Sequence, residues 1–332
     1  MSFFVNFIKG KKQGTLITNN NIMIMKEPMY EYQNLLIPLN LTSMDDVVLK
    51  FASQISGMSN SEKAHFIHVK QPVDVPTEIL EAYPEMISTD LKDRMSKLQK
   101  SVKTGFKGYS RTQTLFDVKE GRALETLIEQ IAERDIDLVL VGRKKIATDT
   151  RKLPIKLAQK APCSVLIIPE ESGASILNIL VPIDFSDYCA NALEVAVNYA
   201  IANDISTIHC LHVFQLPIGY SKTGKSEEEF TEIMMKNARK SYDRFIKKVD
   251  LKGVKVKPEF MLHNRPAQVI QNQVEEKHID MIILGTRGRS TGAGLLLGSV
   301  TENIILNTRV PIFAVKKKGT GLSVLEVLMK YV

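Results

Sequence analysis

The feature that most constrains the fold of this chain is an internal repeat. Four segments of the first half match four of the second in the same order: residues 34–40, 65–69, 135–142 and 161–168 match residues 178–184, 209–213, 278–285 and 310–315. Such self-similarity indicates that one structural unit occurs twice. We predict domains at 30–170 and 175–318, joined by a short polar linker. An extension (1–29), expected to be flexible or disordered, and a helical tail (319–332) complete the 332 residues.

Each repeat alternates between strand-like and helix-like patterns. In the second repeat we expect strands at 179–183, 207–213, 254–261, 281–284 and 311–315, and helices near 191–200, 227–249, 267–276 and 299–307. The strands are nearly continuous apolar runs, which is typical of parallel sheets covered on both faces. The predicted fold is therefore α/β, with two tandem doubly wound, Rossmann-like domains that each contain a five-stranded parallel sheet.

Composition excludes several classes of protein. Hydrophobic residues make up 44% of the chain and charged residues 24%, as in globular proteins with a substantial core. No segment approaches the ~20 apolar residues of a membrane span. The first positive charges follow the short apolar run at the N-terminus, whereas a secretory signal has the reverse order. We therefore expect a cytoplasmic protein without a membrane partner.

The cysteines and the charge distribution lead to the same expectation. Cys163, Cys189 and Cys210 have neither metal-site spacing nor an even number, so we interpret them as reduced core thiols. The net charge is +7, but the basic residues are dispersed. The clusters 143–145 and 316–318 follow strand-like runs, where solvated strand ends are the favoured interpretation over anion or nucleic-acid binding.

A glycine pattern near the C-terminus indicates phosphate binding. Gly285 and Gly288 are followed, after nine residues, by Gly298 and Ser299. Glycines let backbone amides approach a phosphate closely, and a helix that begins at Ser299 would add free N–H groups and its positive dipole end.

A carboxylate is expected beside this loop. Asp184 ends the first strand of the second repeat and Gly285 ends the fourth. In doubly wound sheets, ligands bind outside the carboxyl ends of strands where the strand order reverses. If these two strands are neighbours, the carboxylate and the glycines share one crevice. The alternative role of Asp184 is to cap the following helix, although Ser186 is the better N-cap candidate.

These residues carry a resemblance to a known family. The second half resembles an ATP-binding universal stress protein domain, whose Gly-x2-Gly-x9-Gly-Ser/Thr motif is matched by Gly285, Gly288, Gly298 and Ser299. Residues 182–186 match its Pro-x-Asp-Phe-Ser motif, and His212 precedes Val213 as in its second strand. The first half shares the framework without the motif, so the whole chain resembles a tandem universal stress protein with an adenine nucleotide alpha hydrolase-like fold.

The resemblance implies a ligand and its contacts. It implies that Asp184 holds the adenosine part of ATP, that the backbone at Val213 meets the adenine, and that the glycine loop holds the phosphates together with Mg²⁺. The implied nucleotide contacts are Pro182, Ile183, Asp184, Val213, Leu284, Gly285, Gly288, Gly298, Ser299 and Val300. It also implies that the two halves form an intramolecular pseudo-dimer joined through their last strands. Whether two such chains then form a homodimer stays an open question.

The first half departs from the motif at each decisive point. Asn40 replaces the acid, Arg143 and two lysines follow Gly142, and Pro154, which has no N–H, stands near the Gly-Ser position. We predict that this half has lost the ATP site.

Other residues have structural interpretations. His209 and His212 are three apart on a strand and point to different faces, so we expect no metal site. Arg287 and Arg289 could contact a γ-phosphate or solvent. We identify no catalytic residue. Three functions remain: a nucleotide-binding stress or signalling module, which we favour; a slow ATPase; and a ligand-independent scaffold or chaperone-like protein.

Overall fold

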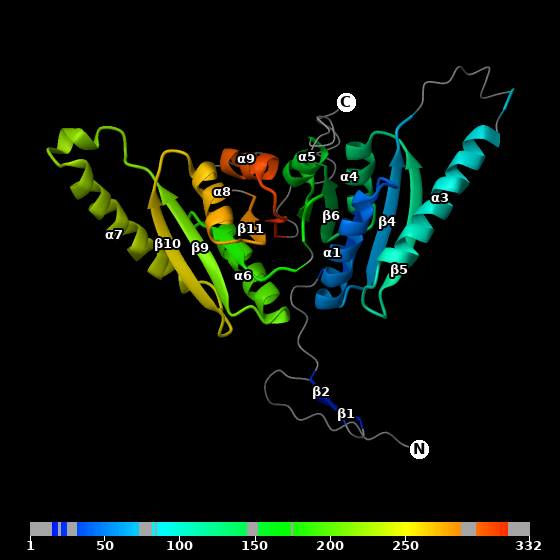
Figure 1. The fold of residues 1–332 in the computed structure, drawn as a ribbon, viewed down its shortest axis with the longest axis horizontal. Coiled ribbons are helices and arrows are strands. Elements are labelled where there is room, and N and C mark those ends of the chain that lie inside the picture. The colour runs from blue at the N-terminus through cyan, green and yellow to red at the C-terminus, as the bar shows by residue number, and fades with distance from the viewer. Residues whose placement is uncertain are drawn as a thin grey trace.

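The computed structural model describes residues 32–72, 82–83, 85–144, 152–173, 175–286 and 297–317, and the backbone of two short strands at 15–18 and 21–24. The predicted site residue Gly288, the two arginines that flank it, and the expected C-terminal helix lie outside these residues. Figure 1 shows the two repeats side by side, with the long helices α3 and α7 at the outer ends.

The first half contains five strands and four helices among its described residues. In chain order these are β3 (Asn34–Pro38), α1 (Met44–Ser59), β4 (Lys63–Lys70), α3 (Glu85–Gly105), β5 (Gln113–Glu120), α4 (Ala123–Glu133), β6 (Leu138–Arg143), α5 (Lys152–Lys160) and β7 (Ser164–Pro169).

The second half repeats this order. Its elements are β8 (Ile179–Pro182), α6 (Asp187–Ala202), β9 (Thr207–Phe214), the short 3₁₀ helix η1 (Tyr220–Thr223), α7 (Glu227–Ile246), β10 (Lys255–Leu262), α8 (Pro266–Glu276), β11 (Met281–Gly285), α9 (Ser299–Asn307) and β12 (Ile312–Val315).

All ten strands of the repeats form one sheet, in the order β10-β9-β8-β11-β12-β7-β6-β3-β4-β5. Within each half the pairs are parallel, and β12 pairs with β7 in the antiparallel direction. The expected α/β fold is confirmed, and the two five-stranded sheets join through their last strands. Because β8 lies between β9 and β11, the strand order reverses at the β8–β11 pair.

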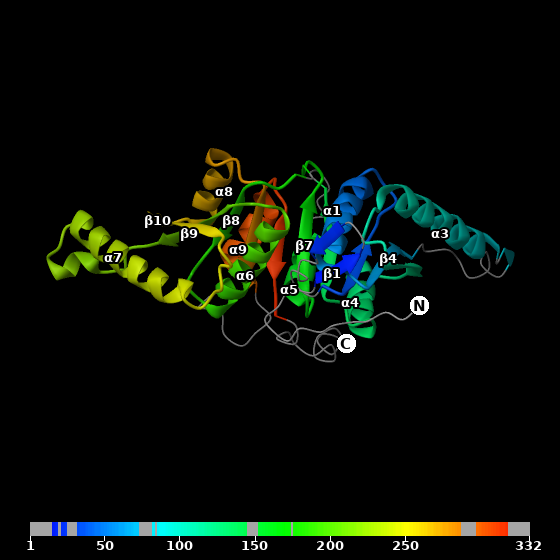
Figure 2. The same ribbon diagram turned by 90° about the horizontal axis from the view of Figure 1, so that it is seen from below.

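Alternation of side chains along the strands produces two cores, one on each face of the sheet. On β12, Phe313 and Val315 belong to one core, while Ile312 and Ala314 belong to the other. The first core lies under α1, α3, α6 and α7, and the second under α4, α5, α8 and α9. Both cores run through the β7–β12 junction, so the two halves share their hydrophobic interior. Figure 2 shows the helices on both faces.

Some elements differ from the expectation in informative ways. The extension, expected to be a flexible tail, contains an antiparallel hairpin of β1 (Thr15–Thr18) and β2 (Asn21–Ile24), which are short segments rich in β-branched residues. The N-terminal part of α7 extends beyond the sheet, so Phe230 is only partly buried and contacts the ring of Tyr220 at 5.7 Å. All three cysteines are buried free thiols, as predicted. Within the part of the chain that the structure describes, no helix has the length and hydropathy of a membrane span.

Candidate functional site

The predicted carboxylate stands at the carboxyl end of β8, in a tight turn that leads into α6. The N–H of Ile183 donates to Leu211 O (2.9 Å), which prolongs the pairing of β8 with β9 by one residue. Asp184 Oδ1 then accepts the N–H of Ser186 at 3.0 Å, and Phe185 between them has a φ of +67°. Ser186 is the N-cap of α6, since its hydroxyl accepts the N–H of Cys189, as the sequence predicted. Asp184 therefore orders the turn, while Ser186 caps the helix.

Cys189, in the first turn of α6, contacts the carboxylate of Asp184. Its thiol donates to Asp184 Oδ1, with Sγ and Oδ1 3.1 Å apart. Burial, and then the nearby charge of Asp184, raise the pKa of this thiol to about 12. The thiol therefore stays protonated at neutral pH, which makes it a donor rather than a nucleophile. The sequence indicates this contact only through the position of Cys189, which is the third residue of α6 after the N-cap Ser186.

His212 holds the same turn from the side of β9. Its Nδ1 donates to Ile183 O at 2.8 Å, and its ring lies 4.3 Å from the ring of Phe185, centroid to centroid. His209, three residues earlier, instead faces Glu259 at 3.4 Å. The two histidines thus have separate structural partners. Among the described residues, no group of three His, Cys, Asp or Glu side chains is placed to hold a metal ion.

Gly285 ends β11, next to β8, and packs against the first turn of α6. A Cβ at this position would lie 2.8 Å from Tyr188 O and 2.9 Å from Tyr188 C. The close approach of two backbones therefore requires glycine here, independently of any ligand. Gly142 occupies the same place in the first half, where a Cβ would meet the side chain of Met44 at 2.9 Å.

Gly298 has no such structural reason to be glycine. It is the N-cap of α9, with φ −61° and ψ 141°, a conformation that any residue adopts. Among the described residues, a Cβ on it would meet only Thr301 Oγ1, at 3.9 Å. Among the described residues, no side chain caps α9, and Ser299 at its first position is exposed. No described side chain thus occupies the N–H groups at this helix N-terminus, the kind of position where anions bind in proteins.

The structure brings most of the predicted residues to one edge of the sheet. β8 and β11 pair in parallel, so Pro182, Asp184 and Gly285 emerge at the same carboxyl edge. The N–H of Gly298 lies within 3.4 Å of Thr286 O, which ties the start of α9 to the end of β11. Leu284 is buried, whereas Val213 and Val300 are partly buried and pack against the core under α8 and α9. These three side chains are apolar and offer no hydrogen-bonding groups of their own.

The first half keeps the turn but exchanges its polar groups. Leu41 has a φ of +59°, like Phe185 in the second half, and His68 Nδ1 donates to Leu39 O at 2.8 Å, like His212. Asn40 replaces Asp184, and Asp45 replaces Cys189. Asp45 is buried and accepts the N–H groups of Asn40 (3.0 Å) and Thr42 (3.2 Å). The carboxylate of this half is thus turned toward its own backbone.

In the first half, ion pairs lie at the carboxyl end of β4, the second strand of that half. Lys70 Nζ lies 2.9 Å from Asp90, and Arg94 also pairs with Asp90 at 3.0 Å. The hydrogen bonds from Lys70 and Arg94 lower the pKa of Asp90 to about 2. Arg94 donates in addition to His68 Nε2 at 3.1 Å. In the second half, the aromatic side chain of Phe214 takes the place of Lys70.

The expectation that the basic cluster after β6 is solvated is wrong for Arg143. This arginine is buried, with 8% of its surface exposed, and it donates to Ile305 O and Thr308 O at the end of α9. Lys316, also expected to be solvated, donates to Gln159 O (3.1 Å) and Ala161 O (2.6 Å) at the end of α5. Local sequence could not show these contacts, because each side chain reaches into the other half.

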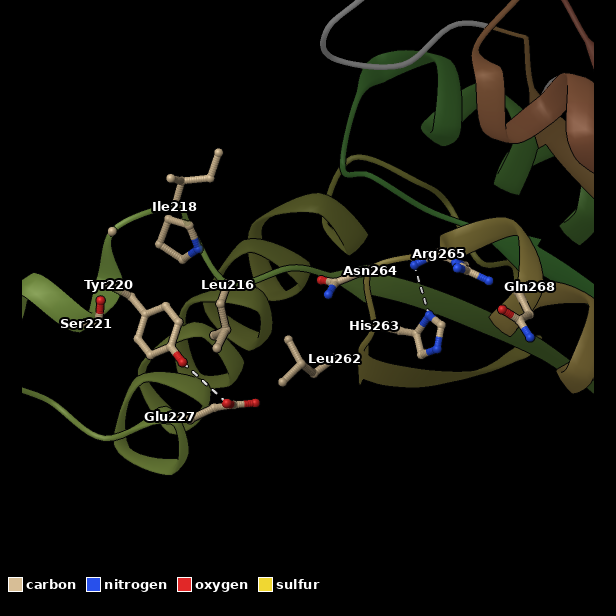
Figure 3. A pocket seen from close by; sticks show the side chains of 12 residues that line it. Leu216, Ile218, Tyr220, Ser221, Glu227, Leu262, His263, Asn264, Arg265 and Gln268 are labelled. Carbon is tan, nitrogen blue, oxygen red and sulfur yellow. Dashed lines mark hydrogen bonds between the residues drawn. The ribbon is translucent and has the colours of Figure 1, made fainter.

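A separate open pocket of about 680 Å³ lies beside the carboxyl ends of β9 and β10 (Figure 3). Tyr220 donates to Glu227 at one end of it, with 3.3 Å between oxygens, and the N–H of Arg265 donates to His263 Nδ1 at the other (2.9 Å). None of the predicted nucleotide contacts that the structure describes lines this pocket.

Comparison with known proteins agrees with the repeat and the fold. The sequence profile of the universal stress protein family matches residues 31–169 and 176–316, so the chain belongs to this family and contains two of its domains in tandem. Two universal stress proteins of Methanocaldococcus jannaschii are similar. One is 32% identical over 141 residues (42% of this chain, 81% of the relative), and the other is 31% identical over 157 residues (43% and 96%). A universal stress protein structure from Archaeoglobus fulgidus has a TM-score of 0.58 at 18% identity and covers 88% of this chain and 99% of its own, which supports the fold.

Proposed function

We propose that this member of the universal stress protein family binds ATP in its second half and acts as a nucleotide-dependent stress-response or signalling module in the cytoplasm. In this proposal the nucleotide lies across the carboxyl ends of β8 and β11, where the strand order reverses. Mg²⁺ would be held through the phosphates, as the family resemblance implies. Bound nucleotide would stabilise one conformation of this half for a partner.

The observation that carries the proposal is the environment of Gly298 among the described residues. Gly285 and Ser186 have structural roles, since Gly285 makes room for Tyr188 and Ser186 caps α6. Gly298 has neither a strained φ nor a described neighbour closer than 3.9 Å, and it heads a helix that no described side chain caps. Glycine at this position is explained if a phosphate occupies the volume of the absent side chain.

The other contacts follow from position and from the family resemblance. Asp184 stands one strand away from Gly285 and would accept hydrogen bonds from the ribose hydroxyls. The backbone of Val213, at the end of β9, would meet the adenine. Ser299 offers its hydroxyl and N–H to a phosphate at the start of α9. Pro182, Ile183, Leu284 and Val300 would form the walls.

The proposal assigns one nucleotide to each chain. In the first half Asn40 replaces the acid, Asp45 is already satisfied by backbone N–H groups, and Pro154 removes an N–H from the first turn of α5. Native mass spectrometry with Mg-ATP should therefore show one bound nucleotide, and two would contradict the loss of the first site.

The decisive test is Gly298→Val. The backbone of residue 298 accepts valine, so the loss of stability should stay within the ~1 kcal/mol of an impaired N-cap. The isopropyl group would fill the phosphate volume, and we expect the affinity for Mg-ATP to fall by at least about tenfold, which corresponds to ~1.4 kcal/mol. Isothermal titration calorimetry on the full chain measures this change.

Gly57→Val is the matched control. Gly57 is exposed on α1 of the first half, and a Cβ there meets no described atom within 4 Å. This variant should bind Mg-ATP like the wild type. Absence of binding in the wild type would refute the proposal and leave the scaffold function. Equal binding by Gly298→Val would remove Gly298 from the site, and turnover of bound ATP would support the slow ATPase instead.

A further inference from the structure

Two basic side chains cross between the halves, and each reaches the end of the other half's last helix. Arg143 is the last residue of β6 and donates to Ile305 O and Thr308 O at the carboxyl end of α9. Lys316 follows β12 and donates to Gln159 O and Ala161 O at the carboxyl end of α5. Cations are favourable at helix carboxyl ends, where unpaired carbonyls and the negative end of the dipole lie.

The two helices that these side chains contact, α9 and α5, differ in their proposed roles. α5 belongs to the half that lacks the phosphate motif, and Pro154 lies in its first turn. α9 begins at Gly298 and Ser299, the proposed phosphate contacts, and is only nine residues long. Its carboxyl end is therefore one short, rigid element away from the phosphates, about 13 Å at 1.5 Å per residue. Arg143 thus holds the far end of the phosphate-binding helix.

Arg143 is also the more specialised of the two side chains. It is 8% exposed, and its planar guanidinium donates to two carbonyls at once. The repeat places Thr286 at the equivalent position after β11, where its carbonyl accepts the N–H of Gly298 at 3.4 Å. The arginine is therefore particular to the first half, at the position where that half departs from the phosphate motif.

We propose that Arg143 is a positioning residue for the nucleotide site of the other half, so that the half without ATP still sets the affinity for ATP. The inference rests on the proposed function. Ile304 and Ile305 anchor α9 in the core, so loss of Arg143 would reorient the helix rather than unfold it. A reoriented helix presents its first N–H groups to the phosphates less accurately, which weakens binding.

Reciprocity gives a second consequence. If Arg143 raises the affinity for ATP, bound ATP strengthens the Arg143 contact by the same factor. Mg-ATP should then slow hydrogen exchange of the amides near residues 304–308, which lie at the opposite end of α9 from the phosphates.

The test compares Arg143→Met with Lys316→Met in the full chain. Each variant removes the two side-chain hydrogen bonds that one of these cations makes to the other half, and each should lower the melting temperature. Only Arg143→Met should weaken Mg-ATP binding, by at least about fivefold, and abolish the exchange protection. Arg143→Lys, which keeps the charge without the planar fork, should give an intermediate affinity and serves alone if Arg143→Met does not fold.

The outcomes separate the two proposals. Lack of Mg-ATP binding by the wild type refutes the proposed function and this inference with it. Binding by the wild type with an unchanged affinity in the Arg143 variants refutes only the inference. Equal weakening by Lys316→Met would also overturn it, because the effect would then come from the interface as a whole.

Discussion

The substitution Gly285→Ala tests whether packing, rather than the nucleotide, requires glycine at the end of β11. The added Cβ would lie 2.8 Å from Tyr188 O, 2.9 Å from Tyr188 C and 3.0 Å from Tyr188 Cβ. These atoms belong to the first turn of α6 and its backbone, so no side-chain rotation relieves the contact. The whole start of α6 has to move away from the sheet.

The magnitude follows from two opposing effects. Overpacking of a core costs about 1–3 kcal/mol. Replacing glycine by alanine also reduces the entropy of the unfolded chain, which stabilises the native state by about 0.4–1 kcal/mol. We expect Gly285→Ala to lower the free energy of unfolding by about 1–2 kcal/mol in the absence of nucleotide.

Gly142→Ala supplies the comparison in the same chain. Its Cβ would meet Met44 Cε and Cγ at 2.9 Å and Val48 Cγ2 at 3.1 Å, all of them side-chain atoms. Methionine is flexible and can turn away, so the cost should stay below about 1 kcal/mol. Urea unfolding without nucleotide measures both variants. The packing explanation would be refuted if Gly285→Ala had the same free energy of unfolding as the wild type. It would also be refuted if Gly142→Ala lost as much free energy of unfolding as Gly285→Ala.

Two further predictions concern charged groups. Asp184→Asn keeps an oxygen that can accept from the N–H of Ser186 and the thiol of Cys189, so the melting temperature should hardly change. The affinity for Mg-ATP should fall by about tenfold or more, because a charged acceptor is lost. Calorimetry that shows an unchanged affinity would exclude Asp184 from the site. Burial, and then Arg134, which donates to His65 Nδ1 at 2.8 Å, lower the pKa of His65 to about 4. Since the unfolded chain protonates this histidine near its ordinary pKa, ~6.5, the free energy of unfolding should decrease by about 2 kcal/mol as the pH falls from 6.5 to 4. Urea unfolding at pH 7 and 4.5 should show a smaller decrease in His65→Asn, and an equal decrease would contradict the assignment.

Much of the fold was predictable because each element has a local cause. The bounds of α9 agree with the predicted 299–307, and Ser186 caps α6 as its position before an apolar helix indicates. Apolar runs placed the strands within one or two residues, and the repeat predicted that both halves share one topology. The order of strands in the sheet and the antiparallel β7–β12 junction depend on long-range pairing, so the structure was needed to establish them.

The errors and omissions at the site share one physical origin. Arg143 has the local sequence of a solvated strand end, and only the neighbouring half supplies the carbonyls that bury it. Tyr188 explains Gly285 through a backbone contact between elements almost a hundred residues apart. The thiol of Cys189 became relevant only because the turn after β8 places Asp184 over the start of α6. Contacts made by tertiary packing leave little trace in the local sequence.

The comparison between the halves separates residues that the fold needs from residues that only a ligand would need. Both halves keep a glycine against the helix after the first strand, a left-handed residue in the turn, and a histidine that donates to the strand end. The glycines and the histidines have packing or hydrogen-bonding partners in the structure. The halves differ at Asp184 against Asn40, and at the start of α9 against α5. Gly298 at the start of α9 has no partner among the described residues that would require glycine. Since the two halves share one sheet and two continuous cores, the same folding constraints act on both. We therefore attribute these differences to the proposed nucleotide. Under this proposal the first half binds no nucleotide itself, but β7 and Arg143 contact the second half and complete its environment.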